Sequence, residues 1–492
     1  MPAGSLPPAQ VTWRNHPMPS ARLALAALSL SVLLSALGTS IANVGLPALA
    51  GAFAAPFQDV QWVVLSYLLA MTTLIVSVGR LGDMIGRRRL LLAGIVLFTA
   101  ASAACGLAPS LWLLVAARAF QGLGAAIMLA LAMAMVGAAV PKARTGSAMG
   151  LLQTMSAVGT ALGPSLGGAI IGWLGWQAIF LVNLPLGALA LVLAYRCLPA
   201  DRRAPDAARE AQSPASPARF DAMGTLVLAG TLAAYALAMT MGRGQFGLLN
   251  LALLGAAAAG IVLFVRVERR AASPLVRLES FRAPALSASL AMTMLVATVM
   301  MATLVVGPFY LARSLGLDAA LVGLVMAAGP IVTALAGVPA GRLVDRFGAP
   351  AVTAGGLALS VLGCVLLAAL PAALGIPGYV VPLAITTAGY ALFQAANNTA
   401  VMVDARPEER GVTSGLLNLA RNLGLVSGAS AMGAVFAFAS AVPDVATAPA
   451  QAIDRGMGIT FAVASGLFAA ALAIALASRA LACRGGAQPK RS

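Results

Sequence analysis

Long apolar runs separated by short polar turns make up most of the sequence between Arg22 and residue 480. Most runs are about 20 residues long, which is the length that an α-helix needs to cross a bilayer and about twice that of a barrel strand. The predicted spans are 23–46, 60–78, 90–107, 111–139, 147–171, 177–195, 223–241, 248–265, 284–309, 321–340, 351–371, 379–402, 412–440 and 457–478. The pattern therefore predicts an all-α polytopic membrane protein with 14 transmembrane helices.

Composition and charge support this prediction. Of the 492 residues, 60% are hydrophobic and 9% are charged, a balance that no soluble fold tolerates. The formal net charge of +16 would suggest nucleic-acid binding in a soluble protein, but here the positive-inside rule explains it better. All but a few of the 31 lysines and arginines fall in turns and tails on one side, which predicts that both termini are cytoplasmic. The exceptions are Arg118, Arg243, Arg313, Arg421 and Arg455.

Polar segments divide the chain into parts. The longest internal one, rich in Pro, Ala, Arg and Ser, follows the sixth span and is a typical linker. We predict a cytoplasmic tail, an N-terminal six-helix bundle, a cytoplasmic linker, two additional transmembrane helices, a cytoplasmic loop, a C-terminal six-helix bundle and a second cytoplasmic tail. These parts cover residues 1–21, 22–196, 197–221, 222–266, 267–282, 283–480 and 481–492, respectively.

A run rich in glycine and arginine separates the second and third spans, from Gly79 to Arg89. Its glycines permit close backbone approach and positive φ, and its arginines hold the turn at the cytoplasmic surface. Gly, Arg, Leu, Asp and Gly recur at identical spacing between Gly341 and Gly348. An ordinary basic loop is the plain alternative for one copy, but two copies at equivalent places indicate an internal duplication.

The fifth span of each predicted bundle also carries a shared glycine pattern. Gly159 and Gly163 lie four residues apart in the first, as do Gly424 and Gly428 in the second. Glycines four apart let helices pack closely, so a packing seam is one explanation of the pattern. The first copy also contains Pro164, which removes a backbone donor and bends the helix, and the second copy has no matching proline.

In these motifs the chain resembles the major facilitator superfamily, in particular its 14-span drug/proton antiporters. The resemblance covers nearly all of residues 22–480. Smaller marks of the 14-span group are Trp176 with Asn183 and Pro185, Phe220-Asp221 before Gly224, and Pro274-Leu275 with Phe281-Arg282. The resemblance implies two pseudo-symmetric six-helix bundles, in which the loop after the second helix acts as a cytoplasmic gate. The implied gating residues are Gly79, Asp83, Gly86, Arg87, Arg88, Gly341, Asp345 and Arg346.

Two further motifs follow from the same resemblance. The fifth helix matches the family's antiporter motif, which is associated with export, through Gly159, Gly163, Pro164 and Gly167. The fourth helix matches a basic motif centred on Arg118, which we expect to face a central cavity. The alternative is a structural arginine that bonds to backbone carbonyls. Arg421 is the second arginine within a span, and an intramembrane charge is costly unless it is paired or hydrated.

Acidic residues depart from the family pattern. Many relatives carry an aspartate implicated in proton coupling where this chain has Gly38. All 15 aspartates and glutamates fall in predicted tails, loops or helix ends, and the only histidine, His16, lies in the N-terminal tail. If transport is proton-driven, the proton must therefore use Asp59, Asp83 or the substrate itself.

The remaining polar residues of the spans are candidate substrate contacts, and interhelical hydrogen bonding is an equally good explanation for each. They are Tyr67, Gln121, Gln153, Gln394, Asn397, Asn398, Asn418 and Asn422. The two intramembrane arginines, with no acid in any predicted span, favour neutral or acidic substrates over lipophilic cations.

The sequence as a whole predicts a secondary transporter of a bacterial inner membrane that exports drug-like molecules or metabolites by alternating access. Uptake by the same fold is the main alternative, and a non-transporting sensor is a remote one. A membrane enzyme is disfavoured because the spans lack a catalytic or metal-binding cluster, and a primary pump because no phosphate-binding loop is present. We expect a small-molecule substrate, lipid contact, no nucleic acid, no cofactor and no metal, with protons and a monomeric state as candidates.

Overall fold

The structure is a computed structural model of the chain. It describes residues 21–75, 77–139, 145–198, 221–241, 247–271, 283–369, 374–404, 410–441 and 448–485, and every regular element in these ranges is a helix. The first part contains α1 (Ala21–Val44), α2 (Leu46–Phe53), α3 (Phe57–Val60), α4 (Trp62–Ile75), α5 (Val78–Ile85), α6 (Arg87–Gly106), α7 (Leu111–Ala139), α8 (Thr145–Leu174), α9 (Ala178–Leu181) and α10 (Asn183–Cys197).

Two helices follow in the middle of the chain, α12 (Ala222–Thr240) and α13 (Leu248–Arg270). The last part contains α14 (Pro284–Phe309), the π-helix η3 (Tyr310–Ser314), α15 (Ala319–Met326), α16 (Ala328–Phe347), α17 (Ala349–Ala369), α18 (Gly375–Asp404), α19 (Arg410–Ser427), the π-helix η5 (Gly428–Met432), α20 (Gly433–Ser440) and α21 (Ala450–Gly485).

Within the described residues, 13 helices are long and apolar enough to cross a membrane. The predicted span 60–78 falls on α4 and the start of α5, and α4 is only 14 residues long. The last predicted span, 457–478, lies within α21, which begins at Ala450 and continues to Gly485. The predicted all-α membrane fold is confirmed, and the division into named parts stays a prediction.

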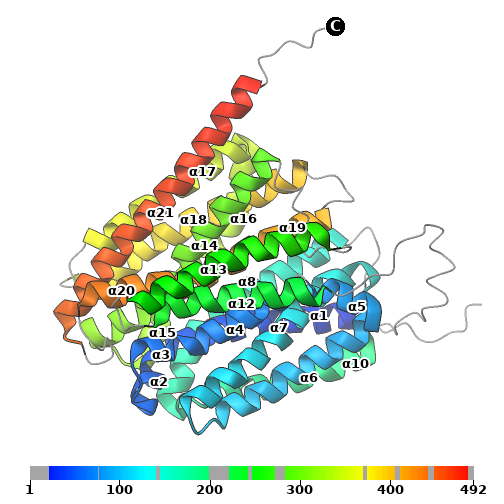
Figure 1. The fold of residues 1–492 in the computed structure, drawn as a ribbon, viewed down its shortest axis with the longest axis horizontal. Coiled ribbons are helices and arrows are strands. Elements are labelled where there is room, and N and C mark those ends of the chain that lie inside the picture. Colours follow the sequence, from blue (N-terminus) through cyan, green and yellow to red (C-terminus); the bar gives the residue numbers. More distant parts are fainter. Residues whose placement is uncertain are drawn as a thin grey trace, which may run out of the picture.

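The N-terminal and C-terminal helices form two groups, with α12 and α13 side by side along the front between them (Figure 1). α12 packs against α4 of the first group and against η5 and α20 of the second. The additional helix pair therefore covers part of the seam between the two groups. Below, we call α1–α10 the N-half and α14–α21 the C-half.

The repeated glycines explain how each half packs. A Cβ atom on Gly159 would lie 2.6 Å from the Leu33 carbonyl oxygen of α1, and a Cβ on Gly163 or Gly167 would lie 1.9 or 2.8 Å from the nearest side-chain atom of α1. In the C-half, a Cβ on Gly424 or Gly428 would lie 2.3 Å from a carbonyl oxygen of α14. Any side chain there would separate the backbones, so the glycine spacing creates the same close helix pair twice.

The two glycine-arginine turns also share a backbone geometry. Gly86 ends α5 with φ of 104°, and Gly348 ends α16 with φ of 80°. Residues with a Cβ atom rarely adopt these angles, so the expectation of positive φ is confirmed at both positions. Each turn reverses the chain directly into the next helix, α6 or α17.

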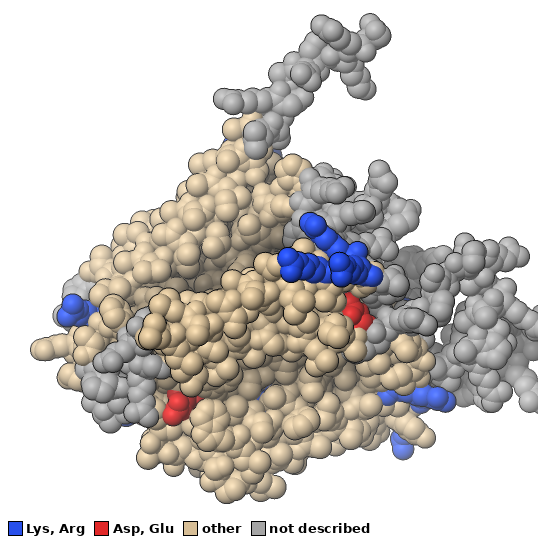
Figure 2. Space-filling view, in the orientation of Figure 1, with Lys and Arg blue, Asp and Glu red and all other residues tan. Residues whose placement is uncertain are grey.

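Described basic side chains gather mainly at one end of the bundle, as the face in Figure 2 shows. Arg266, Arg269 and Arg270 are exposed at the end of α13, and Arg87 and Arg89 are exposed at the start of α6. This is the end at which the positive-inside rule places the cytoplasm.

A central cavity between the two halves

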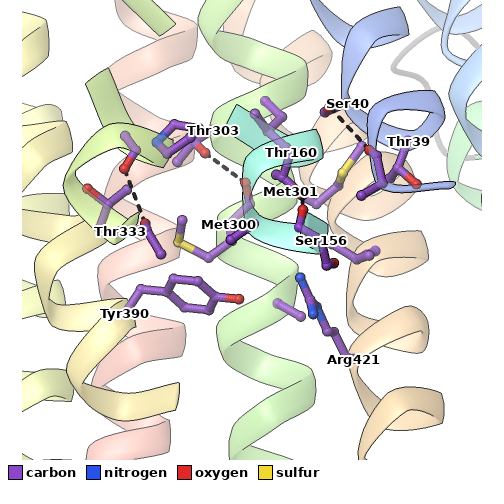
Figure 3. A pocket seen from close by; sticks show the side chains of 18 of the residues that line it. Thr39, Ser40, Ser156, Thr160, Met300, Met301, Thr303, Thr333, Tyr390 and Arg421 are labelled. Carbon is purple, nitrogen blue, oxygen red and sulfur yellow. Dashed lines mark hydrogen bonds between the residues drawn. The ribbon is translucent and has the colours of Figure 1, made fainter. Parts of the chain in front are cut away.

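The candidate functional site is a cavity of about 210 Å³ enclosed by both halves. Its walls come from α1, α4, α7 and α8 on one side, and from α14, α15, α16, α18 and α19 on the other. Figure 3 shows side chains from the two halves directed into the same space. A pocket between helices, lined mainly by apolar groups with a few polar ones, is a common form of small-molecule site.

Methionines form much of the apolar lining: Met71 from α4, Met300 and Met301 from α14, and Met326 from α15. Methionine is unbranched and polarizable, so it adapts to differently shaped ligands. Both halves contribute, so the apolar surface can contact a ligand from two sides. Such a surface is suited to a range of molecules with an apolar body.

Most hydroxyl groups of the lining donate hydrogen bonds within their own helices. Thr39 donates to the Ser35 carbonyl at 3.1 Å, and Thr160 to the Ser156 carbonyl at 2.9 Å. On the other side, Thr303 donates to Met300 and Thr333 to Gly329, at 2.7 and 3.1 Å. Because these protons are used, the hydroxyls present mainly acceptor oxygens to the cavity.

Among the described side chains of the lining, the nitrogen donors all come from the C-half. Arg421 on α19 is partly buried, lines the cavity and makes no hydrogen bond with a described residue. Its neighbour Asn422 is buried with an unpaired Nδ2, and Tyr379 on α18 is buried with an unpaired hydroxyl. Figure 3 shows the polar ends of Arg421 and Tyr390 directed towards the same part of the cavity. No acidic residue is among the described side chains that line it.

At the end that carries α2 and α3, the two halves are in contact. The Phe57 ring lies edge-on to Phe309 and Phe436, with centroid distances of 4.8 and 5.7 Å. Gln61 donates to the Ala429 carbonyl at 3.0 Å. α8 meets α15 where a Cβ on Gly168 would lie 2.7 Å from the Cα of Gly323. These contacts close the cavity at this end, opposite the arginine-rich turns.

Arg118 does not line the cavity, so the expectation that it faces the cavity is wrong. It is fully buried inside the N-half. Nε donates to the Val63 carbonyl at 2.9 Å, and Nη1 donates to the Gly38 carbonyl at 3.0 Å and to Gln121 Oε1 at 2.6 Å. The alternative from the sequence, a structural arginine bonded to backbone carbonyls, describes it correctly.

Aromatic rings complete the surroundings of Arg118. Its guanidinium carbon lies 4.2 Å from the Tyr67 ring centroid and 5.8 Å from that of Phe180. Tyr67 in turn donates to the Ser35 carbonyl at 2.8 Å, and Gln121 donates to Ser102 Oγ at 2.7 Å. The network joins α1, α4, α6 and α7, so the arginine fixes the helices of the N-half to one another.

Some of the predicted substrate contacts line the cavity, and others belong to the Arg118 network or lie elsewhere. Gln394, Asn418 and Asn422 line the cavity, whereas Tyr67 and Gln121 belong to the Arg118 network. Asn397 instead donates to Thr293 Oγ1 at 3.1 Å, and Asn398 is exposed outside the cavity. The side chain of Gln153 lies outside the described residues.

The predicted gating residues lie at the arginine-rich end. The side chain of Asp83 lies outside the described residues. Arg88 donates to the Tyr195 carbonyl and lies 5.3 Å from the Tyr195 ring centroid. Arg87, Asp345 and Arg346 are exposed. A Cβ on Gly79 or Gly341 would meet nothing within 4 Å, so neither glycine is required by packing in this conformation.

The antiporter-motif residues contact α1 and the C-half. Gly159, Gly163 and Gly167 pack on α1 within the N-half, while the Pro164 carbonyl lies against Gly323 of α15. α8 therefore has one face in the N-half core and another at the seam between the halves. The packing seam expected from these glycines is therefore the one between α8 and α1 inside the N-half.

Sequence reasoning missed the methionines and hydroxyls of the lining, as well as Tyr379 and Tyr390. Serine, threonine and methionine are common throughout apolar spans, so their type alone does not mark a cavity. The Met300-Met301 pair and the two tyrosines of one span are the available signals. Neither shows which face of the helix meets the other half.

Comparison with known proteins agrees with the geometry. The family model described as Major Facilitator Superfamily matches residues 28–429. The chain is 34% identical over 427 residues to the "Multidrug resistance protein Stp" of Mycobacterium tuberculosis (strain CDC 1551 / Oshkosh), covering 84% of this chain and 76% of that protein. It is 29% identical to the "Riboflavin transporter RibZ" of Clostridioides difficile (strain 630), covering 84% and 88%.

Among solved structures, a bacterial homolog of the human lysosomal transporter Spinster superposes with a TM-score of 0.67 at 15% identity. The match covers 94% of this chain and 98% of that one. At this identity the likeness concerns the fold alone. The family match, the relatives and the helical fold agree. The chain belongs to the major facilitator superfamily and is a multi-pass membrane transporter rather than an enzyme.

Proposed function

We propose that the protein exports small apolar or amphipathic molecules across a bacterial inner membrane by alternating access, with the central cavity as its transport site. The observation that carries this proposal is a cavity lined by both halves and closed at the α2–α3 end. Rocking of the halves around such a midplane site would expose it to each side in turn.

The orientation follows from charge. The exposed arginines of α6 and α13 mark the cytoplasmic end, so the aromatic contacts of Phe57 lie on the outer side. In this conformation the outer side is closed. Open space beside Gly79 and Gly341 is available for a helix of the opposite half when the cytoplasmic side closes. Asp83, with Arg87 and Arg88, would then hold that closed state.

Export is favoured by relatives whose names describe multidrug resistance or drug efflux. The relative named as a riboflavin transporter keeps metabolite transport in either direction as a second candidate. The methionine-rich lining suits either kind of cargo. Proton coupling would have to use a group outside the cavity or the substrate itself, since no described acid lines the cavity.

The experiment is an accumulation assay in a bacterial host whose own drug pumps are deleted, with a panel of fluorescent drugs and with riboflavin. Export predicts lower accumulation with the wild-type protein than with an empty vector, and Asp83→Asn should abolish the difference while the protein stays in the membrane. Higher accumulation with the wild type would instead establish uptake. Equal accumulation of every compound would reject the proposed function.

A further inference from the structure

The hydrogen-bonding groups of the cavity are unevenly distributed. On the N-half side, Thr39 and Thr160 have used their protons within their own helices. On the C-half side, Arg421, Asn422 Nδ2 and the Tyr379 hydroxyl are donors without a described partner. A buried donor without an acceptor costs free energy comparable to a lost hydrogen bond. The C-half side of the cavity thus has donors for which a ligand could supply the acceptors.

The charge of the cavity also favours a ligand that brings acceptor oxygens. Arg421 is the only charged residue among the described side chains of the lining. Arginine stays protonated in proteins, and its planar fork of N–H groups matches the two oxygens of a carboxylate. A ligand that brought such oxygens would supply both the missing charge and the missing acceptors.

We infer that the cavity selects amphipathic molecules carrying a carboxylate or a similar anionic oxygen group, which binds at Arg421 while the apolar body contacts the methionines. The inference deepens the proposed function and rests on the cavity being the transport site. Asn422, adjacent to Arg421 on α19, adds a donor, and Tyr379 on α18 adds another to the lining.

A cationic ligand would be repelled by the positive charge of Arg421. Two unit charges about 8 Å apart at an effective dielectric near 20 repel by about 2 kcal/mol, which is about a thirtyfold loss of affinity. No described acid of the lining offsets this repulsion. Arg118 adds nothing to recognition, because it is fully buried inside the N-half and does not line the cavity.

The test uses purified full-length protein in lipid nanodiscs and radiolabelled 1-naphthylacetate, an apolar ring with one carboxylate. Competitors are the unlabelled acid, its methyl ester and 1-naphthylmethyl-trimethylammonium, which keep the ring and change the charge. The expected result is that the ester competes at least tenfold more weakly than the acid, and the cation at least thirtyfold more weakly.

Variants test whether Arg421 causes the preference for the acid. Arg421→Ala should weaken acid binding at least tenfold, Arg421→Lys should weaken it less, and Asn422→Leu should weaken it severalfold. Arg313→Ala is the matched control, because Arg313 is exposed on η3 outside the cavity and should bind like the wild type. Unfolding temperature and elution profile verify that each variant is folded.

The inference is overturned if the acid does not bind, if the ester or the cation competes as well as the acid, or if Arg421→Ala keeps the affinity of the parent. These outcomes are read from binding alone. Failure of the proposed function is a different result, namely equal accumulation of every compound in the pump-deficient cells, and it does not depend on the affinity for the acid.

Discussion

Arg118 and Arg421 are the two arginines inside predicted spans, and they differ in their surroundings and in their hydrogen bonds. In the N-half, Arg118 is enclosed by carbonyls, an amide and two aromatic rings, and its role is to join helices. In the C-half, Arg421 lines the cavity and makes no hydrogen bond with a described residue. The comparison teaches that an arginine deep in a span can serve either to join helices or to line a cavity, and that its depth in the span does not decide between the two.

The largest expected effect on stability is that of Arg118→Ala. The change empties the space between Tyr67 and Phe180 and removes the donor to Gln121, with a cost of roughly 3 kcal/mol or more. Thermal unfolding of the purified protein in detergent should show a much lower midpoint and a low yield. Arg118→Met, which refills the volume without the charge, should cost less. Wild-type stability of the alanine variant would contradict the structural role.

Gln121→Leu is expected to have an intermediate effect. It keeps the volume but removes the acceptor of Arg118 Nη1 and the donor to Ser102, for a cost of about 1–3 kcal/mol. The same unfolding assay measures it, and Asn398→Leu is the control because Asn398 is exposed. A midpoint equal to that of the control would show that the amide is not part of the network.

Tyr67→Phe tests the ring separately from its hydroxyl. The variant keeps the aromatic face against Arg118 and loses the hydrogen bond to the Ser35 carbonyl, so the expected cost is about 1 kcal/mol. Its unfolding midpoint should lie between those of the wild type and Gln121→Leu. A loss as large as that of Arg118→Ala would show that the hydroxyl, not the ring, is the main contribution of this residue.

Arg421→Ala should have the smallest effect on stability, below about 0.5 kcal/mol, because no described side chain depends on its hydrogen bonds. The unfolding midpoint should remain near that of the wild type even though binding of the acid is lost. A fall like that of Arg118→Ala would remove the contrast between the two halves.

Much of the fold could be predicted from the sequence because membrane-spanning helices have a strong signal. The predicted spans 111–139 and 284–309 coincide with α7 and α14. The glycine spacing predicted close packing, which occurs at Gly159 and Gly424, and the turn motif predicted positive φ, which occurs at Gly86. Each of these features depends on local backbone geometry or on residue size, both of which the sequence states directly.

The orientation of polar side chains was less predictable. Arg118 and Arg421 looked equivalent in the sequence because both lie well within a span, at a depth that helix rise alone can estimate. Which face of a helix meets its neighbours depends on packing between segments distant in sequence. That is why Tyr67 and Gln121 were placed with Gln394 and Asn422 as candidate contacts, although only the latter two line the cavity.

The most direct test of the account is a reversible cross-link across the outer contacts. In a variant with the native cysteines replaced by serine, Phe57→Cys and Phe436→Cys are joined by a short bis-methanethiosulfonate, and transport into membrane vesicles is measured before and after. The two wild-type rings lie 5.7 Å apart across the two halves. Alternating access predicts that cross-linking stops transport and that a reducing agent restores it. Unchanged transport by the cross-linked protein would contradict the account.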